Sequence, residues 1–146
     1  MSTNPSLRWG VLGTADINST VVPAMTRCTY GQVVAIASRS LPRAQAEATR
    51  LGIDTAYGSY EELLAAADVD AVYICLPNFL HKEWVLAAAA AGKHILCEKP
   101  MAISAADATE MVSAAGSAGV LLAEAFMYGH HPRYDRIHDI VSSGEI

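Results

Sequence analysis

The sequence is poor in charge and especially poor in lysine. Charged side chains make up 17% of its 146 residues, whereas a typical soluble domain has about 25%. Only Lys82, Lys93 and Lys99 occur, no basic run is present, and the formal net charge is -5. Proteins that bind nucleic acids gather positive charge on one face. The composition therefore argues against a nucleic-acid partner and favours a small-molecule ligand.

Long apolar segments and paired cysteines are also lacking. The longest uninterrupted apolar run, residues 84–91, is far shorter than the roughly 18 residues of a membrane span. The opening MSTNPSLRWG has no basic segment followed by an apolar core, so we expect no export signal. The three cysteines, Cys28, Cys75 and Cys97, show no CxxC spacing, which argues against a disulfide framework. We expect a cytoplasmic protein without a membrane partner.

Short apolar segments alternate with helical patterns along the whole chain. Continuous apolar strands separated by amphipathic helices are typical of a parallel sheet covered on both faces. We therefore predict an α/β fold, a Rossmann-type doubly wound sheet with strand order 3-2-1-4-5-6, in one domain spanning residues 1–146. The expected strands are 8–12, 33–38, 55–57, 71–76, 94–97 and 120–123, and the expected helices are 17–28, 41–51, 59–67, 80–91, 104–118 and 131–143.

The first strand runs into the segment GTADIN, residues 13–18. Compared with the GxGxxG loop of dinucleotide-binding folds, Gly13 supplies the tight turn, while Ala15 and Asn18 replace the other two glycines. The loop still offers free backbone N–H groups and a positive helix end to a phosphate. Taken alone, this motif fits an ordinary strand-to-helix turn equally well.

The end of the second strand favours a phosphorylated nucleotide. Sites that prefer NAD usually carry Asp or Glu there to hold the ribose 2′-hydroxyl. This chain has Ser38, Arg39 and Ser40 instead, with Arg43 one turn later and no carboxylate before Glu47. A guanidinium flanked by hydroxyls binds a 2′-phosphate through charge-assisted hydrogen bonds. We predict NADP as the cofactor, with NAD as the other possibility.

The fourth strand ends in CLPNFLHKEW. Pro77 stops the strand, and Asn78 is placed to cap the helix that follows. His81 lies in the first turn of that helix, at the carboxyl edge where open α/β sheets bind ligands. Two interpretations stay open for His81: a packed or capping residue, or a donor to the ribose or nicotinamide.

The fifth strand ends in Glu98, Lys99 and Pro100. Pro100 removes a backbone N–H and restricts Lys99 to an extended conformation, so the direction of the lysine side chain is partly fixed. Glu98 alternates to the other side of the strand. A lysine at a strand end is usually a solvated surface residue, but this lysine lies beside the expected cofactor crevice.

His130 and His131 are adjacent in the sequence, but no carboxylate or cysteine lies near them at the spacing of metal ligands. We therefore predict no metal site.

Several segments together carry a family resemblance. The chain resembles the amino-terminal half of the Gfo/Idh/MocA oxidoreductases, the family of glucose-fructose oxidoreductase and inositol dehydrogenase, from Arg8 onward. Within this family it is most similar to the NADP-using sugar and dihydrodiol dehydrogenases. The segments that carry the resemblance are RWGVLGTADI, ASRS, YGSYEELL, DAVYICLPNFLHKEWVLAAAAAGKHILCEKPMAIS and EAFMYGHHPRYDRI.

The resemblance implies an NAD(P)-dependent oxidoreductase that moves hydride between NADP and a hydroxyl of a sugar, polyol or diol. Lys99 would be the catalytic residue, hydrogen-bonded to that hydroxyl, with Glu98 and Pro100 orienting it. The implied cofactor-binding residues are Gly13, Thr14, Ala15, Ile17, Ser38, Arg39, Arg43, Leu76, Pro77, Asn78, His81, Glu98, Lys99 and Pro100.

The chain also departs from the family pattern. Asn18 and Gly129 stand where the family usually has a small residue and an arginine. The family's carboxyl-terminal α/β domain, which supplies substrate specificity and the dimer sheet, is absent from these 146 residues. We therefore expect little turnover from this chain alone and a possible homo-oligomer. The alternative function is a non-catalytic nucleotide-binding sensor or assembly module. Such a module would not need the Glu-Lys-Pro segment, so the presence of this segment favours an enzyme.

Overall fold

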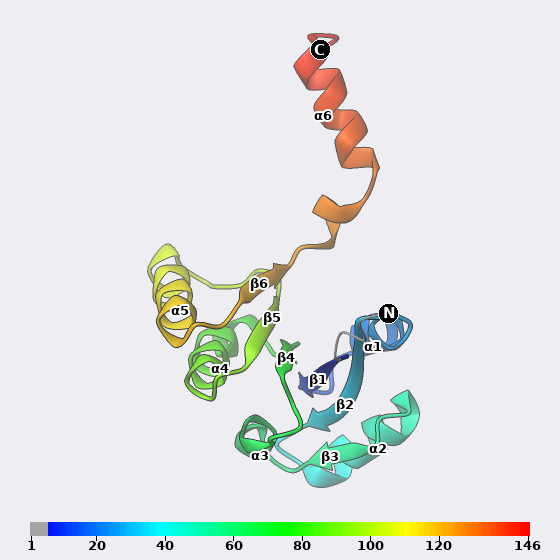
Figure 1. Cartoon of the computed structure of the whole chain (residues 1–146), viewed down its shortest axis with the longest axis vertical. Helices are drawn as coiled ribbons and strands as arrows, with labels where there is room; N and C mark the ends of the chain where they lie inside the picture. The colour runs from blue at the N-terminus through cyan, green and yellow to red at the C-terminus, as the bar shows by residue number, and fades with distance from the viewer. Residues whose placement is uncertain (1–5) are drawn as a thin grey trace.

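A six-stranded parallel sheet forms the centre of the molecule (Figure 1). The computed structural model describes residues 6–146. Neighbouring strands follow the order β3-β2-β1-β4-β5-β6, and every pair is parallel. The predicted fold class and strand order are therefore confirmed. The strands are β1 Leu7–Leu12, β2 Gly31–Ala37, β3 Thr55–Tyr57, β4 Ala71–Ile74, β5 His94–Glu98 and β6 Leu122–Ala125.

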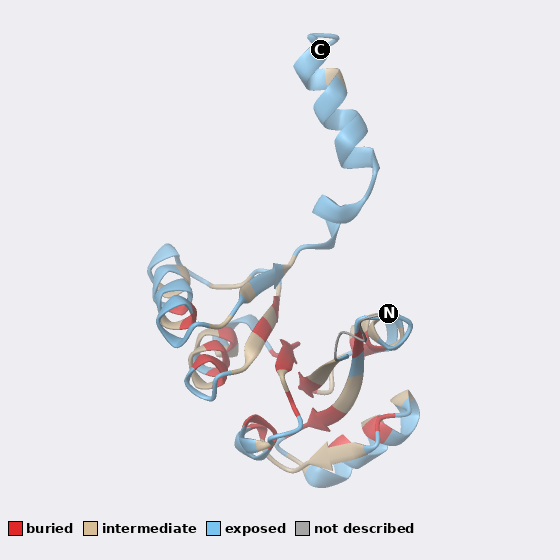
Figure 2. Cartoon of the chain, viewed as in Figure 1, coloured by how far each residue is buried: buried red, intermediate tan, exposed pale blue. Residues whose placement is uncertain are grey.

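Helices cover both faces of this sheet, as parallel connections require. On one face, α1 (Asn18–Thr26) and α2 (Leu41–Leu51) bury Val22 and Ala48 against β1, β2 and β4. On the other face lie α3 (Tyr60–Ala65), α4 (Asn78–Ala90) and α5 (Ala105–Ala118). Figure 2 shows the buried residues gathered between these layers. The core therefore fixes the strand ends from both sides.

Helix ends follow the signals in the sequence. The Ser104 hydroxyl accepts a hydrogen bond from the backbone N–H of Asp107 and donates to its carboxylate, which caps the start of α5. Gly92 and Gly144 adopt the left-handed conformation with φ near +70° and +75°. Each of these glycines follows the end of a helix, where a left-handed residue is common.

Two boundaries differ from the prediction at places that matter for the site. Helix α4 begins at Asn78, with Pro77 at the cap position, so Asn78 is the first helical residue and its side chain does not cap the helix. Strand β6 begins two residues later than expected, because Leu122 and not Val120 is the first residue to pair with β5. The edge of the sheet therefore lies at Ala125.

The carboxyl-terminal segment projects away from the sheet as an arm (Figure 1). We use the name arm for residues 126–146, which contain the 3₁₀ helix η1 (Met127–His130) and α6 (Arg133–Ser143). Neither helix contains a buried residue, and Figure 2 shows the arm almost entirely exposed. Among residues 6–146, none of the helices has the length and apolar character needed to cross a bilayer.

Candidate functional site

Two adjoining hollows lie at the carboxyl edge of the sheet. The first, the loop hollow, has a volume of about 570 Å³ and is bounded by the turn after β1, the end of β2 and the end of β4. The second, the lysine hollow, has about 390 Å³ and is bounded by the ends of β4, β5 and β6. Cys75 and Leu76 line both. Ligands bind at this edge in open α/β sheets, so the two hollows together form the candidate site.

The predicted residues are divided between the hollows. Eight of the fourteen line the loop hollow: Gly13, Thr14, Ala15, Ser38, Arg39, Arg43, Leu76 and Pro77. Five line the lysine hollow, with Leu76 shared: Ile17, Leu76, Asn78, Glu98 and Lys99. His81 and Pro100 line neither hollow.

The glycine turn is fixed by its neighbours. Gly13 has φ of +114°, and a Cβ there would lie 2.9 Å from Leu76 Cδ2 and 3.3 Å from the Cys75 carbonyl oxygen. The Gly13 N–H donates to the Ala37 carbonyl at 3.0 Å, and the Asn18 side-chain amide donates to the Gly13 carbonyl at 3.0 Å. Asn18 thus holds the loop by a hydrogen bond at the position where a small residue was expected.

Two arginines approach the loop hollow from the end of β2 and from α2. Arg43 Nη2 donates to Thr14 Oγ1 at 3.2 Å, which joins α2 to the glycine loop. Arg39 is exposed, whereas Ser38 beside it is buried. No carboxylate lines this hollow within the described chain. Its electrostatics therefore favour an anion.

Tyr60, at the start of α3, also lines the loop hollow, and the sequence reasoning did not identify it. Burial raises the pKa of the Tyr60 hydroxyl, and the positive charge of Arg39 opposes this effect. The ring packs edge-to-face on Trp84, with centroids 4.8 Å apart. The position of Tyr60, shortly after the edge strand β3, was the available signal, because it follows the carboxyl end of a strand as the other site residues do.

A buried tyrosine organises the lysine hollow. The Tyr73 hydroxyl, in β4, donates to Glu98 Oε1 at 2.7 Å, and the Lys99 backbone N–H donates to Glu98 Oε2 at 3.1 Å. Burial and the Glu98 carboxylate both raise the pKa of Tyr73, so its hydroxyl stays protonated. Burial likewise raises the pKa of Cys75 to about 12. This thiol stays neutral at physiological pH.

Lys99 lines the lysine hollow with an exposed side chain. Its Nζ makes no hydrogen bond or salt bridge to the part of the chain that the structure describes. The peptide bond between Lys99 and Pro100 is cis. The amine is therefore available to a ligand, next to a half-buried carboxylate that is already occupied by two donors.

His81 does not fit the prediction of a ligand contact. The side chain is completely buried, and its ring nitrogens lie 3.0 Å from the Pro100 carbonyl oxygen (Nδ1) and 2.8 Å from the Leu76 carbonyl oxygen (Nε2). Because both nitrogens face the backbone, neither is available for a ribose or a nicotinamide. Of the two interpretations left open, the structure supports the packed residue: His81 joins the end of β4 to the turn after β5.

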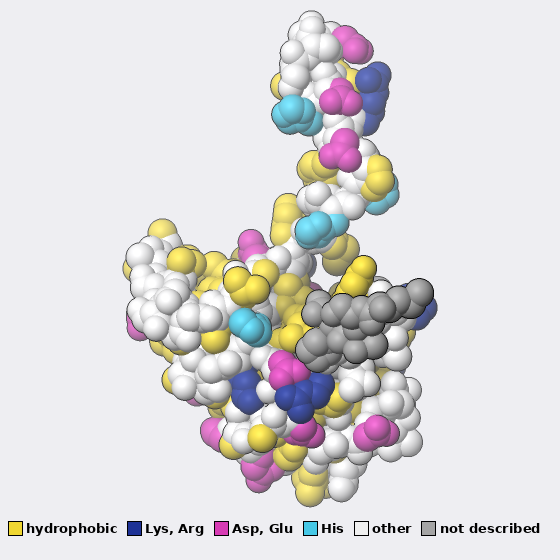
Figure 3. All heavy atoms as spheres, viewed as in Figure 1, with side chains coloured by type: hydrophobic (Ala, Val, Ile, Leu, Met, Phe, Trp, Pro, Cys, Tyr) yellow, Lys and Arg dark blue, Asp and Glu magenta, His cyan; other side chains and the backbone are white. Residues whose placement is uncertain are grey.

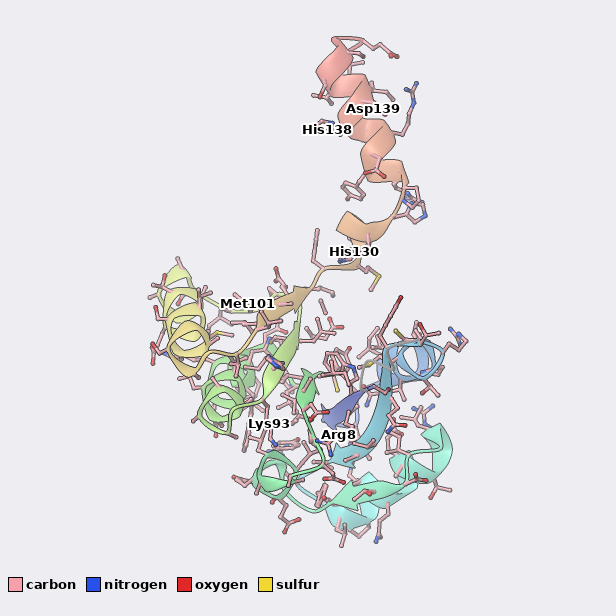
Figure 4. All side chains as sticks on the ribbon, in the orientation of Figure 1. Arg8, Lys93, Met101, His130, His138 and Asp139 are labelled. Atoms are coloured by element: carbon pink, nitrogen blue, oxygen red, sulfur yellow. The ribbon has the colours of Figure 1, made fainter. Side chains whose placement is uncertain are left out.

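Other residues of the lysine hollow were missed for a simple reason. Ala125, Phe126, Met127 and Tyr128 also line it. The predicted sixth strand ended at residue 123, so the residues after the true end at Ala125 were not recognised as part of the edge. His130 lies beyond β6, in the arm (Figure 4). Within residues 6–146, no group of three potential metal ligands is found.

Comparison with known proteins gives a consistent result. The profile of a family described as "Oxidoreductase family, NAD-binding Rossmann fold" matches residues 7–126. The D-xylose 1-dehydrogenase (NADP(+)) 2 of Haloferax volcanii is 50% identical over 138 residues, which are 94% of this chain and 42% of that protein. The trans-1,2-dihydrobenzene-1,2-diol dehydrogenase of Mus musculus is 41% identical over 97% of this chain and 43% of that protein.

A solved structure of similar sequence shows the same fold. A 3-ketoreductase from Actinomadura kijaniata, in complex with NADP and TDP-benzene, superimposes with a TM-score of 0.91 at 40% identity. The match covers 97% of this chain and 43% of the ketoreductase. The chain thus spans less than half the length of each of these relatives.

Proposed function

This chain belongs to the oxidoreductase family with an NAD-binding Rossmann fold, and from that premise we propose that it is the nucleotide-binding part of an NADP-dependent dehydrogenase or reductase. Its substrate class would be a sugar, polyol or diol, because the relatives named above are a D-xylose dehydrogenase, a dihydrodiol dehydrogenase and a 3-ketoreductase. The chain would bind the nucleotide along the two hollows.

The observation that carries the choice of cofactor is the end of β2. Ser38, Arg39 and Ser40 line the loop hollow where an NAD site usually has a carboxylate, and Arg43 reaches the same hollow from α2. An adenosine 2′-phosphate would be held there by charge-assisted hydrogen bonds from the two guanidinium groups. The relatives' names agree, since the xylose dehydrogenase is NADP-dependent and the ketoreductase is bound to NADP.

The glycine turn fits a dinucleotide as well. Gly13 leaves no side chain between the loop and the hollow, and a Cβ at this position would collide with Leu76. The N–H groups of residues 18–20, at the start of α1, donate to the carbonyls of residues 15–17, so the attraction for an anion would come from the positive end of the α1 dipole and from the loop before it. We assign the pyrophosphate to this loop, with Thr14, Ala15 and Ile17 as its lining.

The lysine hollow would hold the nicotinamide and the reacting carbon. When bound, the nicotinamide ring supplies or accepts the hydride. Lys99 would hydrogen-bond the substrate oxygen and stabilise the negative charge that develops on it, an interaction that strengthens in the transition state. Glu98 would orient the lysine backbone, as its hydrogen bonds to Tyr73 and the Lys99 N–H indicate.

Titration with NADPH and NADH tests this proposal. We expect wild type to bind NADPH more tightly than NADH. Substitution Arg39→Asp should weaken NADPH binding by about 10- to 100-fold, the size of one or two charge-assisted hydrogen bonds, and should change NADH binding little. The matched control is Arg27→Asp, which makes the same charge change at an exposed position at the end of α1. Fluorescence of the reduced nicotinamide reports both affinities.

Two results would contradict the proposal. If Arg39→Asp and Arg27→Asp weakened NADPH equally, general charge and not the loop hollow would govern binding. If wild type bound neither nucleotide at millimolar concentration, the hollows would not be a nucleotide site.

A further inference from the structure

The Lys99–Pro100 turn has an unusual set of backbone partners. Pro100 carries no N–H, so the nearest backbone donors are those of Lys99 and Met101 on either side. Each is taken by a carboxylate: the Lys99 N–H donates to Glu98 Oε2 at 3.1 Å, and the Met101 N–H donates to Glu124 Oε1 at 2.8 Å. The turn that presents the lysine is thus held on both sides by an acidic side chain.

The two carboxylates come from different strands. Glu98 ends β5, whereas Glu124 lies in β6, where it is paired with Cys97 in the register of the sheet. Figure 4 shows Met101 beside β6, and its backbone N–H donates to Glu124 of that strand. Glu124 therefore joins the turn after β5 to the neighbouring strand.

The two hydrogen bonds differ in what supports them. Glu98 is locked by the buried Tyr73 hydroxyl at 2.7 Å. Glu124 is exposed, and it is bonded to the turn through the Met101 N–H alone among the described residues. Water competes with the exposed bond from Glu124, so this bond is the less secure of the two contacts that hold the turn.

We propose that Glu124 is a positioning residue for the Lys99 amine. It acts through the Met101 N–H and keeps the turn in the conformation in which Lys99 lines the lysine hollow. This inference rests on the proposed function, in which Lys99 contacts the substrate beside the nicotinamide. Strand β6 would then contribute a residue to the site through Glu124, whereas the Glu-Lys-Pro motif lies at the end of β5 alone.

The scarcity of lysine makes the inference measurable. Lys82 is paired with Asp107 at 2.8 Å and Glu110 at 2.6 Å, and Lys93 donates to the carbonyls of Ala66 and Val69. Because the chain has three lysines, reductive methylation with ¹³C-formaldehyde would give three lysine methyl signals in the NMR spectrum and one from the amino terminus. The Lys99 signal is assigned by its loss in Lys99→Arg.

The first experiment needs no nucleotide. We expect amide hydrogen exchange at Met101 to accelerate about fivefold in Glu124→Ala, the effect of losing one modest hydrogen bond. Glu124→Gln retains an acceptor oxygen and should restore most of the protection. Glu83→Ala is the matched control, because it removes another exposed glutamate, in α4. Unchanged exchange at Met101 in Glu124→Ala would overturn the inference.

The second experiment follows the Lys99 methyl signal while NADP⁺ is added. In wild type and Glu124→Gln the signal should shift as the nicotinium ring fills the lysine hollow. In Glu124→Ala it should shift less than half as far at saturating nucleotide. If Glu124 only stabilised the fold, its substitution would lower stability, but the Lys99 signal would shift equally far in Glu124→Gln and Glu124→Ala.

The outcomes separate the two proposals. If wild type does not bind NADP⁺, the proposed function fails, while the exchange result at Met101 still decides whether Glu124 holds the turn. If wild type binds and its Lys99 signal shifts, but Glu124→Ala shifts equally far, the positioning role is wrong and the nucleotide site stands.

Discussion

At the scale of single residues, the site depends on positions where no other side chain fits. Gly13 has a left-handed φ, and a Cβ added there would lie within 3.3 Å of Leu76 and Cys75. His81 is buried with both ring nitrogens against carbonyl oxygens. The sequence shows only that a glycine and a histidine lie near strand ends, and it does not show what these residues contact. Their neighbours decide whether they bind a ligand or hold the backbone.

We expect Gly13→Ala to destabilise the fold by about 1–3 kcal/mol, because the added methyl group meets Leu76 and the backbone adopts a conformation that alanine disfavours. NADPH binding should weaken at least tenfold. Gly116→Ala is the control: that glycine lies in α5 with open space around its Cβ position, and alanine should stabilise the helix slightly. Urea unfolding and NADPH titration measure the two effects. Equal stability of the two variants would contradict the close packing at Gly13.

Arg39 and Lys99 show what residue types at strand ends can predict. Both were identified because the sheet edge was foreseeable from the apolar segments before them, and both line the expected hollows. For His81 the strand end alone left two interpretations, since its burial depends on the turn after β5, which lies 19 residues further along the chain. Contacts of this kind are not encoded in local pattern.

At the scale of elements, a salt bridge joins β1 to the entry of β4. Arg8 lies in β1, and its guanidinium donates to both carboxylate oxygens of Asp70, at 2.9 and 2.6 Å. The Arg8 backbone N–H donates to the same carboxylate at 2.9 Å. Figure 4 shows Arg8 and Lys93 close together, away from Met101. The ion pair thus joins β1 to the start of β4 at the amino edge of the sheet, opposite the site.

The hydrogen bonds and charge of Arg8 lower the pKa of Asp70 from 3.8 to about 2. The carboxylate therefore contributes stability above about pH 4 and loses it as the pH falls through 2. We expect Asp70→Asn to cost about 1 kcal/mol at pH 7, the size of a partly solvated ion pair, and to cost clearly less near pH 2, because the carboxyl is partly protonated there. Asp54→Asn, at an exposed carboxylate, is the control. Urea unfolding at both pH values tests this; an equal cost at both would contradict it.

The elements themselves were largely predictable. Helix α2 and strand β3 have the predicted boundaries, because capping and turn residues delimit them. Strand β6 was misplaced by two residues, since Val120 and Leu121 are apolar but precede the pairing with β5. The sequence Leu-Ala-Glu-Ala of β6 contains two alanines and a glutamate, residue types that are depleted in strands, and it therefore carries little strand signal. Glu124 was overlooked for the same reason.

At the scale of the whole molecule, the placement of the arm is the feature that the sequence did not predict: the expected helix 131–143 is present as α6, but it lies away from the sheet. Figure 3 shows it standing clear of the body, with apolar side chains on its surface. Phe126, Met127 and Tyr128 are each more than half exposed, and Ile137 and Val141 line one side of α6. A helix of 11 residues is only marginally stable without packing. Apolar exposure on this scale favours self-association, so a homo-oligomer stays our expectation.

Limited proteolysis checks the state of the arm. We expect trypsin to cleave after Arg133 and Arg136 at least tenfold faster than after Arg50 or Lys93, which lie in or beside packed elements. Local opening governs such rates. Mass spectrometry of the early fragments identifies the sites. If the arm were protected and light scattering showed a dimer, the arm would be buried between two copies; protection in a monomer would contradict the extended arrangement.

The shared wall between the hollows implies a modular ligand site. Cys75 and Leu76 belong to both compartments, so a dinucleotide has to cross the tip of β4 to occupy them together. Adenosine 2′,5′-bisphosphate and nicotinamide mononucleotide, added as separate fragments, should therefore bind at the same time without competing, as calorimetry would reveal. Joining them pays the cost of association once and not twice. The dinucleotide, which joins the two fragments across the tip of β4, should then bind more tightly than either fragment alone.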